Sequence, residues 1–208
     1  RLFGVKAPTS GNQKVLVKYG TPEQKKKFLE PTIYEGQTAC YSMTEPDNAG
    51  SDPRSIQTTA TREGEEWVLN GSKIFITQGT VGGTYVVLAS TDKSKGNHGI
   101  TAFIVDADTP GFSKQPLKEK LGMRSSDTAV LTFEDVRVSD SRRLGEVGKG
   151  FINTLQILDR GRITIGALAL GLGAGALEAS RDYALEREQF GRPIAKFQAI
   201  QWKLADMA

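Results

Sequence analysis

The sequence has 208 residues, of which 38% are hydrophobic and 25% charged, and its formal net charge is +3. This composition is ordinary for a globular protein of one large or two smaller domains. No block of five like charges occurs, so nucleic-acid binding is not favoured, and one histidine, His98, excludes a His-rich metal centre; we expect no metal. The single cysteine, Cys40, cannot form an internal disulfide. The longest apolar stretch, Ile163–Leu177, has 15 residues. A membrane-spanning helix needs roughly 20, so we expect no membrane span.

The first part of the chain has a helical pattern. Thr21-Pro22-Glu23-Gln24 has the residues of a capping box, because threonine caps a helix, proline suits its first position and glutamine follows three residues after the cap. We predict a helix from this cap to about Leu29. Residues 1–37 are interpreted as the tail of an N-terminal helical domain, so we expect the chain to begin inside a longer protein.

The hydrophobic period changes to two between Thr38 and about Val138, which predicts β-strands. The dipeptide Asn70-Gly71, between two β-prone runs, predicts a tight hairpin turn. The predicted strands are 38–41, 56–61, 67–70, 71–76, 85–89, 100–105 and 129–133. Short strands without long helices between them are typical of an antiparallel barrel or sandwich. We therefore expect a middle β-barrel domain at residues 38–147.

Helical periodicity returns in the last third of the chain. Apolar residues recur every three or four positions from Phe151 to about Arg187, which predicts one long helix. Gly191-Arg192-Pro193 interrupts this pattern, and a second helix is predicted from Phe197 to Met207. Residues 148–208 are therefore expected to be the start of a C-terminal helical-bundle domain that continues past Ala208. The expected fold class is α+β, a β-domain flanked by helical segments.

The segment Ser42–Asp52, SMTEPDNAGSD, follows the first predicted strand and is crowded with hydroxyl, amide and carboxyl groups. It is longer than an ordinary turn of about two to five residues. The residues alone leave two interpretations open. The segment is either a ligand-binding loop or a solvent-exposed loop held by Asx-turns.

Five motifs occur in order along the chain: TEPxxAGSD at 44–52, KxFIT at 73–77, DRGR at 159–162, ALEREQFGRPIxxFQAIQ at 184–201 and LADMA at 204–208. Together they resemble the acyl-CoA dehydrogenase family. The resemblance implies an N-terminal helical domain, a middle β-barrel and a C-terminal helical bundle, with FAD bound between the last two and a tetrameric assembly. Between Glu45 and Gly50 the chain has one residue more than the family's common pattern, with Asp47-Asn48 in place of a single residue.

The resemblance also implies which residues bind FAD. Thr44 and the backbone around it would hydrogen-bond the isoalloxazine, Phe75 would pack on the ring, and Thr77 would approach N5. For Ile76 an ordinary inward-facing strand position is the preferred alternative. Ser51 would contact the flavin pyrophosphate or CoA. The full implied FAD set is Tyr41, Met43, Thr44, Gly50, Ser51, Phe75, Ile76, Thr77, Arg187, Phe190 and Gln198, the last three reaching a neighbouring subunit's FAD.

Asp159 and Arg162 lie three residues apart and share one face of the predicted helix. The resemblance implies that this pair and Ser51 bind the CoA portion of the substrate. The alternative is an intrahelical ion pair worth a few tenths of a kcal/mol.

The implied reaction is the FAD-dependent α,β-dehydrogenation of an acyl-CoA thioester to the trans-2-enoyl-CoA. One family position for the catalytic glutamate is occupied here by Gly161, so no catalytic base is expected in this chain and a glutamate beyond residue 208 is expected instead. A non-catalytic acyl-CoA or flavin-binding protein, and an acyl-CoA oxidase or flavin monooxygenase of the same fold, are the alternatives. The resemblance implies electron-transfer flavoprotein as electron acceptor, and a mitochondrial matrix or bacterial cytoplasmic location.

Overall fold

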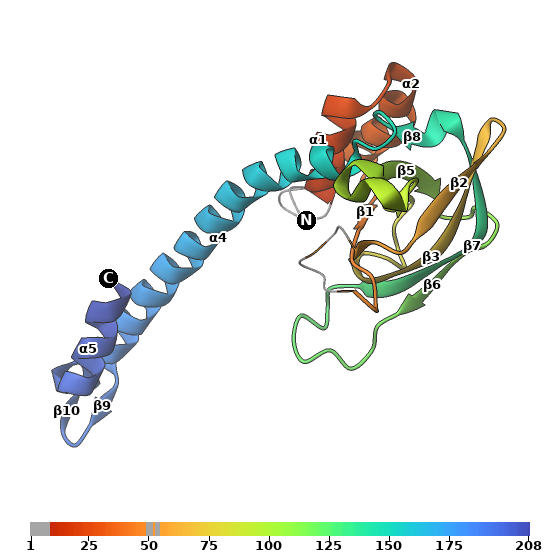
Figure 1. Ribbon diagram of the computed structural model, residues 1–208. Helices are drawn as coiled ribbons and strands as arrows, with labels where there is room; N and C mark the ends of the chain where they lie inside the picture. The colour runs from red at the N-terminus through yellow and green to blue at the C-terminus, as the bar shows by residue number, and fades with distance from the viewer. Residues whose placement is uncertain (1–8, 49–51, 53–54) are drawn as a thin grey trace. The chain divides into compact units, whose positions relative to one another are not determined.

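The computed structural model describes residues 9–48, 52 and 55–208 (Figure 1). The chain divides into two compact units, Arg1–Leu158 and Asp159–Ala208. Each unit is considered by itself, because their relative position is not determined.

The first unit opens with α1 (Thr9–Tyr19), followed by α2 (Pro22–Gln24), the π-helical turn η1 (Lys25–Leu29) and α3 (Glu30–Tyr34). The predicted capping box is confirmed: the Gln24 amide donates to Thr21 Oγ1 at 3.2 Å, and the Thr21 amide donates to Gln24 Oε1 at 3.1 Å. The helical turns continue past the predicted end at Leu29. Pro31 lies in the first turn of α3, where its missing N–H is tolerated.

Eight strands form one sheet. They are β1 (Ala39–Ser42), β2 (Thr59–Glu63), β3 (Glu66–Thr77), β4 (Thr84–Ser90), β5 (Ile100–Asp106), β6 (Phe112–Pro116), β7 (Thr128–Ser139) and β8 (Arg143–Leu144). The strand order is β6-β7-β3-β2-β4-β5-β8, with β1 paired to β4. The short 3₁₀ segments η3 (Lys93–Gly99) and η4 (Asp140–Arg142) join β4 to β5 and β7 to β8.

The sheet is not the closed antiparallel barrel of the prediction. Within the described chain no ladder joins β6 to β8, the two ends of the strand order, and β1 and β2 both pair with β4 in parallel. The sheet is nevertheless strongly curved. The Trp67 ring of β3 lies 5.3 Å from the Phe103 ring of β5, and the Tyr85 ring of β4 lies 4.7 Å from the Phe112 ring of β6, although neither pair of strands is adjacent.

Two hydrophobic clusters form the core. The first lies on the concave side of the curved sheet and contains Trp67, Tyr85, Val87, Phe103 and Phe133. The second lies between the opposite face of β4 and β5 and the helices, and contains Leu16, Phe28, Val86, Leu88, Ile104 and Phe151. Because successive residues of β4 alternate between the two clusters, all seven of its residues are buried.

The predicted hairpin turn at Asn70-Gly71 is wrong. β3 runs without interruption through these residues for 12 positions, and the turn lies instead at Gly64-Glu65, between β2 and β3. Gly71 has φ +143°, and a Cβ there would lie 2.7 Å from the Thr58 Cα. The glycine therefore serves a β-bulge and a close backbone approach, since the pairing of β3 with β7 changes register between Leu69 and Gly71.

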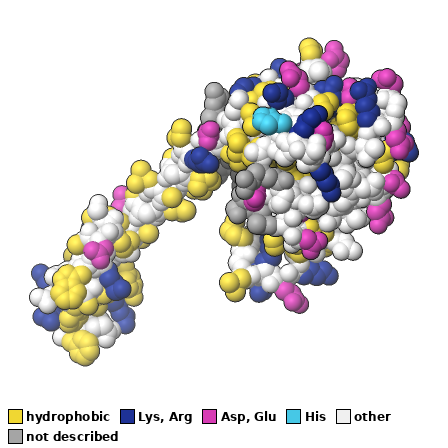
Figure 2. Space-filling model, in the orientation of Figure 1, with side chains coloured by type: hydrophobic (Ala, Val, Ile, Leu, Met, Phe, Trp, Pro, Cys, Tyr) yellow, Lys and Arg dark blue, Asp and Glu magenta, His cyan; other side chains and the backbone are white. Residues whose placement is uncertain are grey.

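The long helix α4 (Gly150–Glu186) begins in the first unit and continues into the second. The hairpin β9 (Glu188–Gln189) and β10 (Arg192–Pro193), the 3₁₀ turn η5 (Ile194–Lys196) and α5 (Gln198–Met207) follow. Large apolar side chains are exposed along this unit (Figure 2), including Ile163, Leu170, Phe190 and Trp202. By length and composition alone, one helix of the described chain, α4, could cross a membrane, a test that core helices of soluble proteins also pass.

Candidate functional site

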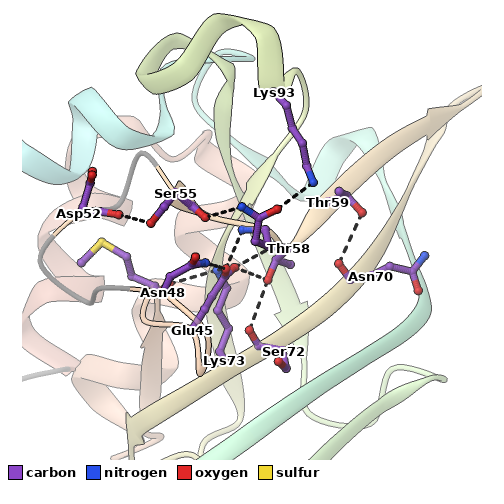
Figure 3. Close-up of polar contacts among 12 residues, drawn as sticks. Glu45, Asn48, Asp52, Ser55, Thr58, Thr59, Asn70, Ser72, Lys73 and Lys93 are labelled. Atoms are coloured by element: carbon purple, nitrogen blue, oxygen red, sulfur yellow. Dashed lines mark hydrogen bonds and ion pairs between the residues drawn. The ribbon is translucent and has the colours of Figure 1, made fainter.

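The Glu45 side chain is the centre of a buried polar cluster (Figure 3). Its Oε1 accepts hydrogen bonds from Lys73 Nζ at 2.9 Å, the Thr58 amide at 2.9 Å and Thr58 Oγ1 at 2.5 Å. Its Oε2 accepts from Asn48 Nδ2 and the Gln57 amide, both at 2.6 Å. Five donors therefore saturate this one carboxylate.

Lys73 lies on β3 and is fully buried, and its Nζ also donates to the Met43 carbonyl at 3.1 Å. Burial lowers the pKa of Lys73 to about 8, against the opposing charge of Glu45. The pKa of Glu45 is lowered from its usual value: burial alone would raise it, but the Lys73 charge and the hydrogen bonds outweigh that effect. Both groups are therefore charged near neutral pH, and they form a buried ion pair.

The structure brings together the ends of two strands that carry predicted FAD-binding residues. Tyr41, Met43 and Thr44 lie at the end of β1, and the Ile74 amide of β3 donates to the Thr44 carbonyl at 2.9 Å. The Tyr41 hydroxyl is buried against Thr154 Oγ1 in the first turns of α4, and burial raises its pKa to about 12. That hydroxyl is therefore already hydrogen-bonded within the protein.

The last three residues of β3 are Phe75, Ile76 and Thr77. Phe75 has φ +60°, which is rare for a bulky residue, and its side chain is 65% exposed. Ile76 is buried in the first core cluster. It therefore occupies the ordinary inward-facing strand position that the sequence analysis preferred for it. Thr77 pairs with Thr128 of β7 and is half-buried. The strand end therefore presents one aromatic ring to solvent beside a threonine.

The predicted substrate-binding residues of α4 lie on the exposed surface of the second unit. Arg162 NH1 donates to Asp159 Oδ1 at 3.0 Å, and both side chains are largely exposed. Apart from Gly161, its chain neighbours and the backbone of its own helix, no atom of the described residues lies within 4 Å of the position that a Cβ would take on Gly161. Gly50 and Ser51 lie outside the described residues.

The three residues predicted to reach a neighbouring subunit lie at and after the end of α4, and all are exposed. Phe190, 92% exposed, and Gly191 both have positive φ at the tip of the β9–β10 hairpin. The Phe190 ring meets the Phe197 ring edge-on, with centroids 6.1 Å apart. The Arg187 carbonyl accepts from the Ile194 amide at 2.8 Å, which closes the hairpin, and Gln198 begins α5.

Residues 40–136 match the family model of the acyl-CoA dehydrogenase middle domain, and residues 148–208 match that of the acyl-CoA dehydrogenase C-terminal domain. The short-chain-specific acyl-CoA dehydrogenase of Megasphaera elsdenii is 48% identical over 91% of this chain and 49% of its own length. This chain belongs to the acyl-CoA dehydrogenase family.

Two further proteins that resemble this chain are a reductase and a dehydrogenase. The acryloyl-CoA reductase (NADH) of Anaerotignum propionicum is 46% identical over 93% of this chain and 49% of its own length. The solved structure of butyryl-CoA dehydrogenase from Megasphaera elsdenii has a TM-score of 0.87 and 47% identity, covering 94% of this chain and 51% of that chain. The chain thus spans about half the length of the relatives it matches.

The residues at the ends of β1 and β3 fit the flavin that the acyl-CoA dehydrogenase family implies. Phe75 offers an exposed aromatic face, and the Thr44 and Thr77 hydroxyls have no hydrogen-bond partner within the described part of the chain. A planar ring with polar edges needs both kinds of contact. The cavity beside Glu45 has a volume of about 130 Å³. Ligand pockets usually enclose about 300–1,000 Å³, so this cavity, which is lined by the residues around Glu45, Gln57 and Ser72, is too small by itself to enclose a flavin.

The sequence analysis missed the role of Lys73 and of its partners Asn48, Gln57 and Thr58. The one signal for Lys73 was its place inside the KxFIT motif, as a charged residue within a β-prone run that reaches the core. The pattern of the sequence could not identify Glu45 as its partner, because 28 residues separate the two.

Proposed function

We propose that the protein containing this chain is an FAD-dependent acyl-CoA dehydrogenase that converts an acyl-CoA thioester to the trans-2-enoyl-CoA. The observation that carries this proposal is the hydrogen bond from the Ile74 amide to the Thr44 carbonyl, which brings Thr44 next to the strand end with the exposed Phe75 ring and Thr77, in a chain of this family. When bound, FAD supplies the acceptor for the hydride that leaves the β-carbon.

The residues proposed to hold FAD fall into two groups. Met43, Thr44, Phe75 and Thr77 contact the isoalloxazine, with Tyr41 and Ile76 contributing through the backbone and Gly50 and Ser51 through the loop. Arg187, Phe190 and Gln198 reach the FAD of a neighbouring subunit. Arginine suits this role because its planar fork donates two hydrogen bonds to a pyrophosphate at once.

Ser51, Asp159 and Arg162 are proposed to bind the CoA portion of the substrate. The exposed Asp159–Arg162 pair has remaining hydrogen-bonding capacity, since only one contact between the two side chains is made. Gly161, beside this pair, leaves room but offers no base.

Removal of the α-proton needs a carboxylate with a raised pKa. Glu45 does not suit this task, because five donors saturate its carboxylate and its pKa is lowered rather than raised. The family resemblance, with Gly161 at one position of the base, instead assigns the base to a glutamate beyond residue 208.

The proposed organisation has three parts, residues 1–37, 38–147 and 148–208. The division of the structure after Leu158 differs from the proposed boundary because the continuous helix α4 crosses it. The curved sheet, with facing aromatic rings from strands that are not adjacent, supports a sandwich-like β-domain. The proposed assembly is a homotetramer without nucleic acid or a membrane span, with electron-transfer flavoprotein as acceptor, in the mitochondrial matrix or bacterial cytoplasm.

Anaerobic bleaching of the flavin tests this function. The full-length protein should purify with FAD, and a panel of acyl-CoA thioesters should bleach the visible absorbance of the flavin, as expected for a two-electron reduction. The 208-residue chain alone should not do so, because it lacks the base. Absence of FAD, or no bleaching by any thioester, would reject the proposal.

A second candidate, reduction of an enoyl-CoA, is favoured by the similarity to the acryloyl-CoA reductase. Rapid reoxidation of the reduced flavin by an enoyl-CoA, with net NADH consumption, would identify this direction. Rapid reoxidation by air would instead indicate an oxidase.

A further inference from the structure

One buried carboxylate joins both ends of the loop between β1 and β2. The chain leaves β1 after Ser42 and enters β2 at Thr59. Glu45, on the outgoing limb, accepts from the amides of Gln57 and Thr58 and from the Thr58 hydroxyl on the returning limb. The hydrogen bonds to this single side chain therefore join the two limbs directly.

Lys73 connects both limbs to β3. Its ammonium group donates to Glu45 and to the Met43 carbonyl, and the side chains of the pair are 0% and 4% exposed. A buried ion pair is weak evidence for stability, because well-packed apolar residues of similar volume often serve as well or better. Two desolvated charges at this place therefore suggest another role, and in some proteins buried polar groups specify one conformation or register.

The backbone fixed by this pair is the backbone that carries the predicted flavin contacts. Lys73 holds the Met43 carbonyl, and the next carbonyl, Thr44, accepts from the Ile74 amide. Phe75, two residues beyond Lys73, lies where the pairing of β3 with β7 changes register and where φ is positive. Along the chain, Glu45 directly follows Thr44, and Lys73 precedes Phe75 by two residues.

We propose that Glu45 and Lys73 are positioning residues that fix the backbone of residues 43–48 and of Phe75 before any ligand binds. The role in FAD binding rests on the proposed function, whereas the ordering of the loop does not. Preorganisation matters because a loop that must be ordered on binding loses affinity to the entropy of that ordering.

The test compares three variants of the full-length protein: Lys73→Met, Glu45→Gln and the double variant. The Glu63→Gln/Arg137→Met variant is the matched control, because it removes an exposed ion pair of 2.8 Å from the same sheet. Hydrogen exchange of the FAD-free protein measures the order of residues 43–48 and 57–58, with the buried strands β4 and β5 as internal reference. Quenching of FAD fluorescence in a titration gives the dissociation constant.

Each single variant should lower the thermal midpoint, because it leaves one buried charge without its partner. The double variant should recover most of that loss. Its exchange at residues 43–48 should nevertheless remain faster than in the wild type. Its FAD dissociation constant should rise by about 10–100-fold, by analogy with residues that orient the ligands of metal sites. The control should change none of these quantities.

Unchanged exchange at residues 43–48 in the double variant would overturn the positioning role, whatever happens to FAD. Faster exchange with a wild-type FAD dissociation constant would show that the pair orders the loop without serving the cofactor, which also overturns the proposal. Failure of the wild-type protein to bind FAD would reject the proposed function, and it is distinguishable because it does not depend on the variants.

Discussion

Phe75 has a conformational cost that its own contacts do not offset. Its φ of +60° lies in a region that costs a bulky residue about 1–3 kcal/mol. Its side chain is 65% exposed, so little apolar burial compensates for that strain. Such strain is common where a side chain must be held ready for a ligand.

Replacement of Phe75 by glycine should separate folding from flavin binding. Glycine tolerates positive φ, so Phe75→Gly should leave the unfolding free energy of the FAD-free protein unchanged or raise it by up to about 1 kcal/mol. Loss of the ring should weaken FAD binding about tenfold, the equivalent of roughly 1.4 kcal/mol of aromatic stacking. Phe75→Leu, which keeps bulk and strain, is the control and should weaken FAD binding without the gain in stability. Equal FAD affinity in all three proteins would contradict this role for the ring.

Asp140 is a residue whose protonation should affect stability in acid. Its carboxylate accepts two hydrogen bonds from Arg143 at 2.9 Å and one from Trp67 Nε1 at 2.7 Å, and these lower its pKa to about 2. A lowered pKa in the folded state stabilises the protein above the unfolded value of about 3.9. This contribution is lost as the pH falls from about 4 towards 2.

Asp140→Asn should lower the free energy of unfolding by about 1 kcal/mol at pH 6. This value is discounted for solvent screening, because the carboxyl is partly exposed. Urea unfolding, followed by Trp67 emission in a Trp202→Phe background, measures it. The difference between the variant and its parent should shrink as the pH is lowered to 2. A difference that is independent of pH would show that packing, rather than charge, dominates.

At the scale of secondary-structure elements, β3 combines three functions along one strand. Its first half pairs with β2 in a hairpin, Gly71 allows the close approach of Thr58, and its second half carries Lys73 and Phe75. The pairing of β3 with β7 changes register twice, once at Gly71 and once between Lys73 and Ile76, where Phe75 lies. β-Bulges often serve to redirect a side chain beside a functional site.

The bulge at Gly71 should be intolerant of any side chain. A Cβ there would lie 2.7 Å from both the Thr58 Cα and Thr58 Oγ1, so Gly71→Ala should lower the unfolding free energy by more than about 2 kcal/mol. It should also weaken FAD binding, because Thr58 holds Glu45. Gly64→Ala is the control, since Gly64 has φ +61° with open space around it and should cost only about 1 kcal/mol. Similar losses of unfolding free energy in the two variants would mean that the backbone around Thr58 shifts to accommodate the methyl group.

At the scale of the whole molecule, the second unit exposes many large apolar side chains. Exposed side chains include Ile163, Leu168, Leu170, Leu172 and Trp202. Exposed apolar side chains that gather into a large patch commonly mark an interaction surface. It agrees with the proposal that α4 and α5 pack within a larger helical bundle and assembly.

Replacement of Arg187 by alanine in the full-length protein should weaken FAD retention and the tetramer together. Loss of a charge-assisted contact should cost roughly 1.5–3 kcal/mol, which is about 10–100-fold in FAD affinity. Flavin content after dialysis and the mass from light scattering measure the two effects. Arg181→Ala is the matched control, because Arg181 is an exposed arginine near the end of α4, the helix that ends just before Arg187, and it pairs with its neighbour Asp182. Full flavin content in Arg187→Ala would refute the shared site.

The sequence by itself determined the family and most of the elements, because these depend on local signals. The five motifs identified the acyl-CoA dehydrogenase family, which the comparisons confirmed. The capping box at Thr21, the apolar, β-branched runs of β4 and β5 and the helical period of α4 are each signals between residues close together in the chain. Such windows carry the physical preference of the backbone directly.

Only the tertiary structure decided the features that depend on partners distant in the chain. Asn70-Gly71 has the residues of a turn, but pairing of β3 with both β2 and β7 keeps the strand continuous. In the folded sheet, Gly71 instead allows the close approach of Thr58. β6 was not predicted, since the polar residues of FSKQP become a strand only by pairing with β7. The ion pair of Glu45 and Lys73 joins residues 28 positions apart, and only the folded sheet brings their charges within 2.9 Å of each other, out of contact with water.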